Sequence, residues 1–241
     1  MRSLTAAELL DVWEAGQGLS LPARAVTLLA AASPDLGWDG AVGLPIGERD
    51  RRLLTLREWL FGATVASVVA CPRCGERLEL SFAVRDIQAP ALTDGADYHL
   101  TVDGYAVEFR LPTSRELLRV ADLDAETAAH HILMACVTAS RDGQPVAADN
   151  LPAIAEEAIA ARMAAADPQA DARLALTCAA CGHAWDVVFD ITSFLWQEIE
   201  TWAQRTLIEI HLLARAYGWT EGEILALSAR RRRLYLELVQ R

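Results

Sequence analysis

The sequence predicts an α+β protein with two tandem helical repeats and a helical hairpin at its C-terminus. Three observations favour this fold class. Two segments match each other at a constant offset of 107 residues, as Cys71 and Cys178 do. A segment between the matched regions alternates apolar and polar residues, and the residues after 192 carry apolar side chains at helical spacing. We expect a first repeat over 1–92, a β-hairpin and the second repeat over 93–192, and the C-terminal helical hairpin over 193–241.

Composition and charge limit the classes of function. The 241 residues are 53% hydrophobic, which is enough to bury one core or two. The net charge of −11 argues against a main partner that is a nucleic-acid backbone, because phosphate binding needs a positive face. The N-terminus does not resemble a secretion signal, and the longest uncharged apolar run, Trp59 to Cys71, is too short to span a bilayer. We therefore expect a cytoplasmic protein with reduced thiols.

The internal repeat depends on more than the cysteines. The other matched positions are Leu44-Pro45 with Leu151-Pro152, Phe82 with Phe189 and, at an offset of 108, the Thr-x-x-Glu boxes beginning at Thr5 and Thr113. Each box predicts the start of a capped helix. Each copy is then expected to contain that helix, a second apolar helix, a loop reaching Leu-Pro, a further helix, and a Cys-x-x-Cys-Gly turn that opens a strand. The sequence therefore indicates a duplication.

Alternation of apolar and polar residues predicts the strands. The segments 78–84 and 185–191, which follow the two cysteine pairs, have the period of a half-buried strand. The segment 98–111 alternates on both sides of Asp103-Gly104, a dipeptide that suits a tight hairpin turn. The alanine-rich segment 153–166 is expected to form a thin covering helix.

Helical spacing and breaks define the C-terminal hairpin. A helix is expected from Ser193 to Tyr217, where Gly218-Trp219 ends it. The capping box Thr220 to Glu223 predicts the start of one last helix, which continues through Leu238. The two helices are expected to pack as a hairpin.

The two cysteine pairs have the spacing of metal-binding knuckles. Four thiolates can complete a tetrahedral zinc site, and the glycine after each second cysteine permits the backbone turn that such a knuckle needs. The expected ligands are Cys71 and Cys74 in the first repeat and Cys178 and Cys181 in the second. One structural zinc would then join the two copies as a shared zinc ribbon.

Thiol redox chemistry is the alternative interpretation of these pairs. Redox Cys-x-x-Cys motifs lie at a helix start after a strand, whereas each pair here precedes a predicted strand. A catalytic zinc would need an open position for water, which four thiolates do not leave. The familiar phosphate-binding, metalloprotease and serine-hydrolase motifs are missing. We therefore expect a protein that is not an enzyme.

Aromatic residues and arginines near the C-terminus are candidates for partner binding. Large aromatic side chains dominate interface energetics, although the same residues can form the core of the hairpin. The four consecutive arginines suit docking to an acidic protein surface, and they also leave open a nucleic-acid adaptor. The candidate residues are Trp196, Trp202, Trp219, Arg230, Arg231, Arg232 and Arg233.

These features together resemble a known family. The second copy with its hairpin, from Val102 through Leu111-Pro-Thr-x-x-Glu-Leu to Leu151-Pro152 and the second Cys-x-x-Cys-Gly, resembles the T-even phage baseplate hub and hub-assembly proteins. Relatives of these occur in contractile tails and phage-tail-like contractile injection systems. The first copy, around 44–50 and 71–75, is similar to versions found in injection-system clusters, and the segment 216–235 resembles small helical proteins of tail-assembly clusters.

The resemblance implies a non-enzymatic chaperone or adaptor for assembly of the baseplate of a contractile particle, with hub, spike or other particle proteins as partners and no membrane. Two other classes remain open from the residues. A zinc-ribbon regulator or nucleic-acid adaptor would use Arg230 to Arg233, and a thiol redox protein would use the cysteine pairs.

Overall fold

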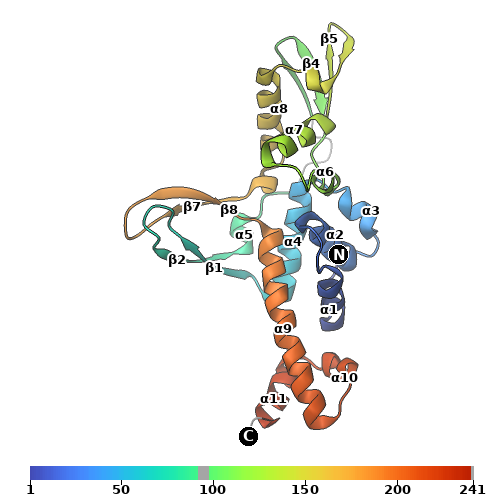
Figure 1. Cartoon of the computed structure of the whole chain (residues 1–241), viewed down its shortest axis with the longest axis vertical. Helices are drawn as coiled ribbons and strands as arrows, with labels where there is room; N and C mark the ends of the chain where they lie inside the picture. The colour runs from blue at the N-terminus through green and yellow to red at the C-terminus, as the bar shows by residue number, and fades with distance from the viewer. Residues whose placement is uncertain (92–97, 240–241) are drawn as a thin grey trace.

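The computed structural model describes residues 1–91 and 98–239 and has mixed helix and antiparallel sheet, as expected for an α+β protein. A helical body occupies the middle of an elongated molecule, a small sheet with two helices lies at one end, and the C-terminal helices lie at the other (Figure 1). Two strand pairs project sideways from the body as an arm. Among the described helices, none has both the length and the apolar character that crossing a membrane would require.

The helical body is built from the first helices and the start of a long later one. The helices of the first segment are α1 (Ala6–Ala15), α2 (Leu21–Ala32), α3 (Gly37–Val42) and α4 (Ile46–Phe61). The capping box at Thr5 is present and begins α1. Leucines of α2 and α4 are fully buried, and α9 (Ile191–Tyr217) closes the core with Leu195, Trp196 and Ile199. The first half of α9 is therefore part of the body.

The arm consists of two antiparallel strand pairs. The pairs are β1 (Thr64–Ala70) with β2 (Arg77–Ala83) and β7 (Arg173–Thr177) with β8 (Ala184–Val188). The strands after the cysteines are confirmed, whereas the strands before them were not predicted. Thr64–Ala70 lies in an uncharged apolar run without clear alternation, and Arg173–Thr177 is only five residues long. The short helix α5 (Val84–Ile87) and the 3-10 turn η2 (Pro168–Asp171) lead between the arm and the rest of the molecule.

A four-stranded sheet in the order β3-β4-β5-β6 forms one end of the molecule. Its strands are β3 (His99–Val102), β4 (Tyr105–Phe109), β5 (Val137–Arg141) and β6 (Gln144–Val146). The predicted hairpin is confirmed, with positive φ values of 51° at Asp103 and 77° at Gly104. The second hairpin was not predicted, although Asp142-Gly143, with φ values of 49° and 76°, is the same turn signal.

Helices pack beside this sheet. They are α6 (Ser114–Arg119), which begins at the predicted capping box, α7 (Ala125–Ala135) and α8 (Ala153–Ala166), with the 3-10 turn η1 (Ala148–Asn150) before α8. The alanine-rich helix α8 covers the sheet as expected: Ala155, Ile159 and Met163 pack against Val107 and Phe109.

The C-terminal part differs from the prediction of one last helix. It contains α10 (Glu221–Ala226) and α11 (Ala229–Val239), separated at Leu227 and Ser228. Leu227 has an extended backbone (φ −72°, ψ 142°), and the hydroxyl of Ser228 accepts a hydrogen bond from the N–H of Arg231 at 3.3 Å. A serine that caps a new helix explains the break. Gly218, in the left-handed conformation, ends α9 as predicted.

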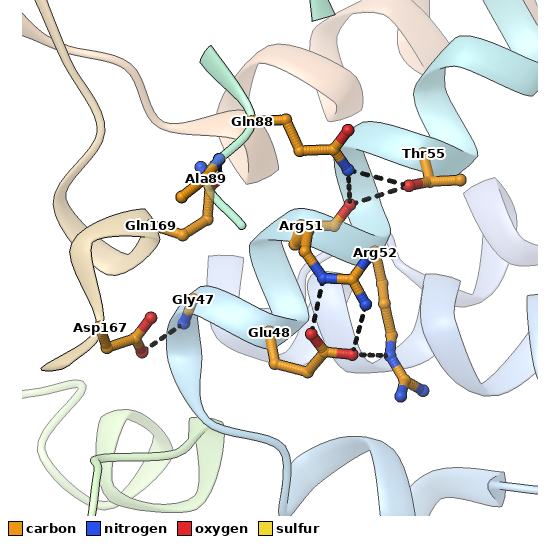
Figure 2. Close-up of polar contacts among 9 residues, drawn as sticks. All are labelled: Gly47, Glu48, Arg51, Arg52, Thr55, Gln88, Ala89, Asp167 and Gln169. Carbon is orange, nitrogen blue, oxygen red and sulfur yellow. Dashed lines mark hydrogen bonds and ion pairs between the residues drawn. The ribbon is translucent and has the colours of Figure 1, made fainter. Parts of the chain in front are cut away.

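A polar junction joins α4 to the second segment (Figure 2). The N–H of Gly47, in the first turn of α4, donates to the carboxylate of Asp167 at 2.8 Å, so a residue 120 positions away caps this helix. A Cβ on Gly47 would lie 1.7 Å from an oxygen of Asp167, which explains the need for glycine. The side-chain oxygen of Gln169 accepts from the N–H of Ala89 at 2.6 Å. These bonds fix where the second segment leaves α8.

Candidate metal centre

Each cysteine pair lies in the turn of one arm hairpin, with the same backbone hydrogen bonds in both. In the first hairpin the N–H of Gly75 donates to the carbonyl of Cys71 at 2.9 Å, and the N–H of Cys71 donates to Glu76 at 2.8 Å. The second hairpin repeats these bonds at Gly182 and Cys178. Gly75 and Gly182 have φ values of 76° and 68°, a region that favours glycine. The two hairpins therefore present their cysteines in the same way.

The four sulfur atoms meet at the tip of the arm. All of them lie within 4.8 Å of one another. The closest contacts connect the two hairpins, at 3.7 Å between Cys71 and Cys181 and 3.6 Å between Cys74 and Cys178. Zinc bound tetrahedrally to four sulfurs at about 2.3 Å would hold those sulfurs about 3.8 Å apart. The cysteines named from the sequence can thus bind one metal ion of this size.

Contacts along the arm relate equivalent residues of the two hairpins. Phe82 and Phe189, which match at the offset of 107, stack edge to face with ring centroids 5.6 Å apart. Each inter-hairpin sulfur contact joins the first cysteine of one pair to the second cysteine of the other. This reciprocal pattern is the arrangement that a local twofold axis produces.

Backbone N–H groups favour one thiolate in this cluster. Burial raises the pKa of the Cys71 thiol, but the N–H groups of Cys74 and Arg73 outweigh burial and bring its pKa to about 7. The N–H of Glu76 favours the Cys74 thiolate, but the neighbouring sulfurs oppose it more strongly and raise the pKa of Cys74 to about 12. A cation bound between the sulfurs would offset this effect of the neighbouring sulfurs on the Cys74 thiolate. Four thiolates and a divalent metal are therefore mutually stabilising.

Zinc affinity is expected to fall as the pH is lowered. A metal must displace the protons of these thiols, and at lower pH more protons compete for the same sulfurs. We expect the dissociation constant to rise about tenfold or more for each pH unit below 7. A competition titration against a coloured zinc chelator between pH 5 and 8 measures this change. An affinity that does not depend on pH would show that zinc does not bind to thiolates.

The fifth cysteine and the nearby histidine lie outside the cluster. Cys136 is buried beside the sheet, where burial raises the pKa of its thiol to about 11. The ring of His183 stacks on Trp185 at 5.7 Å. Cys136 is thus the small buried side chain of a core.

Comparison with known families identifies the chain. Residues 28–196, more than half of the sequence, match the family described as T4 bacteriophage base plate protein. The matched region runs from α2 into α9 and includes both arm hairpins.

The chain belongs to this baseplate protein family.

The resemblance stated from the sequence is thereby confirmed at the level of the family. No curated protein and no solved structure matches this baseplate protein. The match excludes α1 at one end and α10 and α11 at the other.

Two of the residues expected to bind a partner are buried in this baseplate protein. Trp196 is 5% exposed and lies in the main core beneath Arg24, whose guanidinium stacks on its ring at 4.5 Å. Arg232 is also 5% exposed; it pairs with Glu209 at 3.2 Å and donates to the carbonyl of Leu227 at 2.9 Å. Both expectations are corrected here, because the helical period turns these two side chains inward.

The remaining predicted partner residues are accessible to different degrees. Trp202 and Trp219 are half-buried and pack into the C-terminal cluster, where Trp219 stacks with Tyr217 and Tyr235. The arginines Arg230, Arg231 and Arg233 are exposed on α11. The structure brings none of these residues to the cysteine cluster.

A groove between α7 and α8 was not predicted from the sequence. Its volume is about 820 Å³, and its lining includes Leu133, Met163, Ala160 and Glu156. The sequence did contain an indication of it, because α7 carries the consecutive apolar residues 132–134, which remain half-buried.

Proposed function

We propose that this protein assists or joins assembly of the baseplate of a contractile particle, as a non-enzymatic chaperone or adaptor held together by one structural zinc ion. The family match supports the baseplate role. The observation that carries the zinc assignment is the meeting of Cys71, Cys74, Cys178 and Cys181 within 4.8 Å.

The zinc is assigned a structural role. Four thiolates fill a tetrahedral coordination shell, so water and substrate have no open position on the metal. The ligands come from two hairpins whose cysteine pairs lie about a hundred residues apart in the sequence. A metal ion there would fasten the ends of both hairpins, and through them the first segment and the segment that follows α8.

We further propose that the two arm hairpins belong to duplicated segments. Supporting observations are the matching positions in sequence, the equal hydrogen bonds of the two knuckles and the reciprocal sulfur contacts. Capped helices begin at Thr5 and Thr113, and Leu44-Pro45 and Leu151-Pro152 each precede a longer helix. The copies differ in between, since at the offset of 107 α3 stands where the second segment has β6 and η1.

Baseplate hub, spike or other particle proteins are the proposed partners. The family description supports partners of this kind. The C-terminal end offers exposed apolar side chains, including Ile208 at 61% and Leu234 at 52% exposure, next to the exposed arginines of α11. Such surfaces are typical of interaction sites.

Assembly in the producing cell tests the proposed function. Cells that lack the chain are expected to yield tubes or subassemblies without complete baseplates, and a tagged wild-type chain is expected to co-purify with baseplate proteins. A tagged chain with Arg85→Ala is the matched control, because the side chain of this arginine on α5 is 88% exposed and its change should leave assembly intact. A normal yield of complete particles without the chain would contradict the proposal.

Two assays on the purified chain discriminate the other two classes of function, the nucleic-acid adaptor and the thiol redox protein. Salt-sensitive retention of DNA or RNA by the purified chain would favour the nucleic-acid adaptor. Reduction of insulin disulfides by the zinc-free chain would favour a thiol redox protein, although each cysteine pair lies in a hairpin and not at a helix N-terminus.

A further inference from the structure

The apolar side chains of helix α7 are incompletely buried. It is an 11-residue helix, and none of its residues is buried. Ile132, Leu133 and Met134 are only half-buried. An amphipathic helix is normally stabilised by burial of its apolar face, so this face is suited to a further partner. The groove between α7 and α8 opens along the same surface.

The groove combines an apolar floor with acidic edges. Leu133, Ala160 and Met163 contribute the apolar lining. Glu126, Glu156 and Glu157 also line the groove, as does His130, which lies 3.6 Å from a carboxylate oxygen of Glu156. A complementary occupant would present apolar side chains flanked by cations.

Helix α11 has these properties. It is 11 residues long and buries only Arg232. Leu234 and Leu238, one helical turn apart on the outward face, are 52% and 56% exposed. The exposed Arg230 and Arg231 precede Leu234 by four and three positions and therefore share its side of the helix. The exposed Glu237 follows Leu234 by three positions and lies on this side as well, so the outward face of α11 is an apolar stripe with a net charge of +1 from Arg230, Arg231 and Glu237.

The groove and α11 cannot meet within one molecule. Figure 1 places α7 and α8 at one end of the long axis and α11 at the other, with the helical body between them. Helix α9, 27 residues long, sets this separation. Contact between the two surfaces requires two molecules.

We propose that α11 of one copy docks in the α7–α8 groove of a second copy. Leu234 and Leu238 cover the apolar floor, while Arg230 and Arg231 face Glu156 and Glu157. The contact is head-to-tail, so a pair joined by one such contact retains one free groove and one free α11. Such a contact closes into a ring or continues as a chain. The inference does not depend on the zinc ion or on the baseplate role, because the purified chain alone tests it.

Sedimentation velocity of the purified zinc-loaded chain, from about 1 to about 100 μM, measures the association. We expect assemblies larger than dimers that dissociate on dilution or in high salt. Charge reversal of the groove (Glu156→Arg with Glu157→Arg) and of the helix (Arg230→Glu with Arg231→Glu) should each weaken association about tenfold or more. Arg232 is left unchanged because it is buried and paired. Arg85→Glu, at the exposed arginine of α5, is the control and should associate like the wild type.

Mixing separates this contact from general charge effects. The groove variant retains a basic α11, which complements the acidic groove of the helix variant. The reversed groove of the first variant likewise complements the reversed α11 of the second. Each variant alone is therefore expected to associate weakly, whereas an equimolar mixture of the two should restore the larger assemblies. All four reversals in one chain should restore the larger assemblies. A wild-type chain that stays monomeric at every concentration would overturn the proposal, even if an added basic amphipathic peptide binds the groove. Variants that all associate like the wild type would also overturn it.

Discussion

Replacing Cys71 with serine is expected to abolish zinc binding and to destabilise the folded chain by at least about 4 kcal/mol, the linkage free energy when free zinc exceeds its dissociation constant by about a thousandfold. Cys71 is 2% exposed at the tip of the arm, and its sulfur lies 3.7 Å from that of Cys181. Serine cannot supply the thiolate, and the two arm hairpins have no ladder of hydrogen bonds between them. Metal analysis and thermal unfolding at matched zinc concentrations measure both effects.

Cys136→Ala is the matched control for this experiment. This cysteine is also buried, at 3% exposure, but it lies in the sheet core and outside the sulfur cluster. It should retain one zinc per chain and lose at most about 1 kcal/mol. If Cys71→Ser retained a full equivalent of zinc with an unchanged melting temperature, the shared four-thiolate site would be wrong.

Replacing Arg57 with methionine is expected to destabilise the protein by about 3 kcal/mol or more. The Arg57 side chain is 3% exposed and forms two hydrogen bonds to Glu198 of α9, at 2.9 and 2.7 Å. It also donates to the carbonyls of Gly62 and Thr64 at 2.7 and 2.8 Å. One guanidinium therefore joins the end of α4, the start of β1 and the first half of α9. Its removal leaves these acceptors without their cation.

Urea unfolding of a double-mutant cycle checks this prediction. Glu198→Leu in the Arg57→Met background should recover part of the loss, because the uncompensated carboxylate is then absent. Arg85→Met, at the 88% exposed arginine, should change the free energy of unfolding by less than about 0.5 kcal/mol. Equal stability of Arg57→Met and the wild type would mean that α9 is not anchored through this pair.

Features with local chemical causes were predictable from the sequence. The capping boxes at Thr5, Thr113 and Thr220 begin helices because the reciprocal Thr and Glu hydrogen bonds close within one turn. Asp103-Gly104 makes a hairpin turn because both residues tolerate positive φ. Cysteine spacing and the following glycine define each knuckle in the same local way. The candidate ligands could therefore be named without knowing where the knuckles lie in space.

Other features depend on which surfaces meet. Trp196 and Arg232 were assigned to a partner surface because composition does not show which side of a helix faces the protein core. The strands before the cysteines form because a hairpin partner pairs with them, and their own alternation is weak. The break at Leu227 and Ser228 reflects competition between continuing a helix and capping a new one that packs back on α9.

Sequence alone indicated the mixed fold class, the four candidate thiol ligands and the resemblance to baseplate proteins, because these depend on short-range patterns and side-chain chemistry. Folding in three dimensions was needed to bring two cysteine pairs about a hundred residues apart to one point, to bury Trp196 and Arg232, and to leave α7 and α11 uncovered at opposite ends. Local propensity does not determine which face of a helix or strand is buried. That choice depends on packing between segments that are distant in the sequence, so no single stretch of residues reveals it.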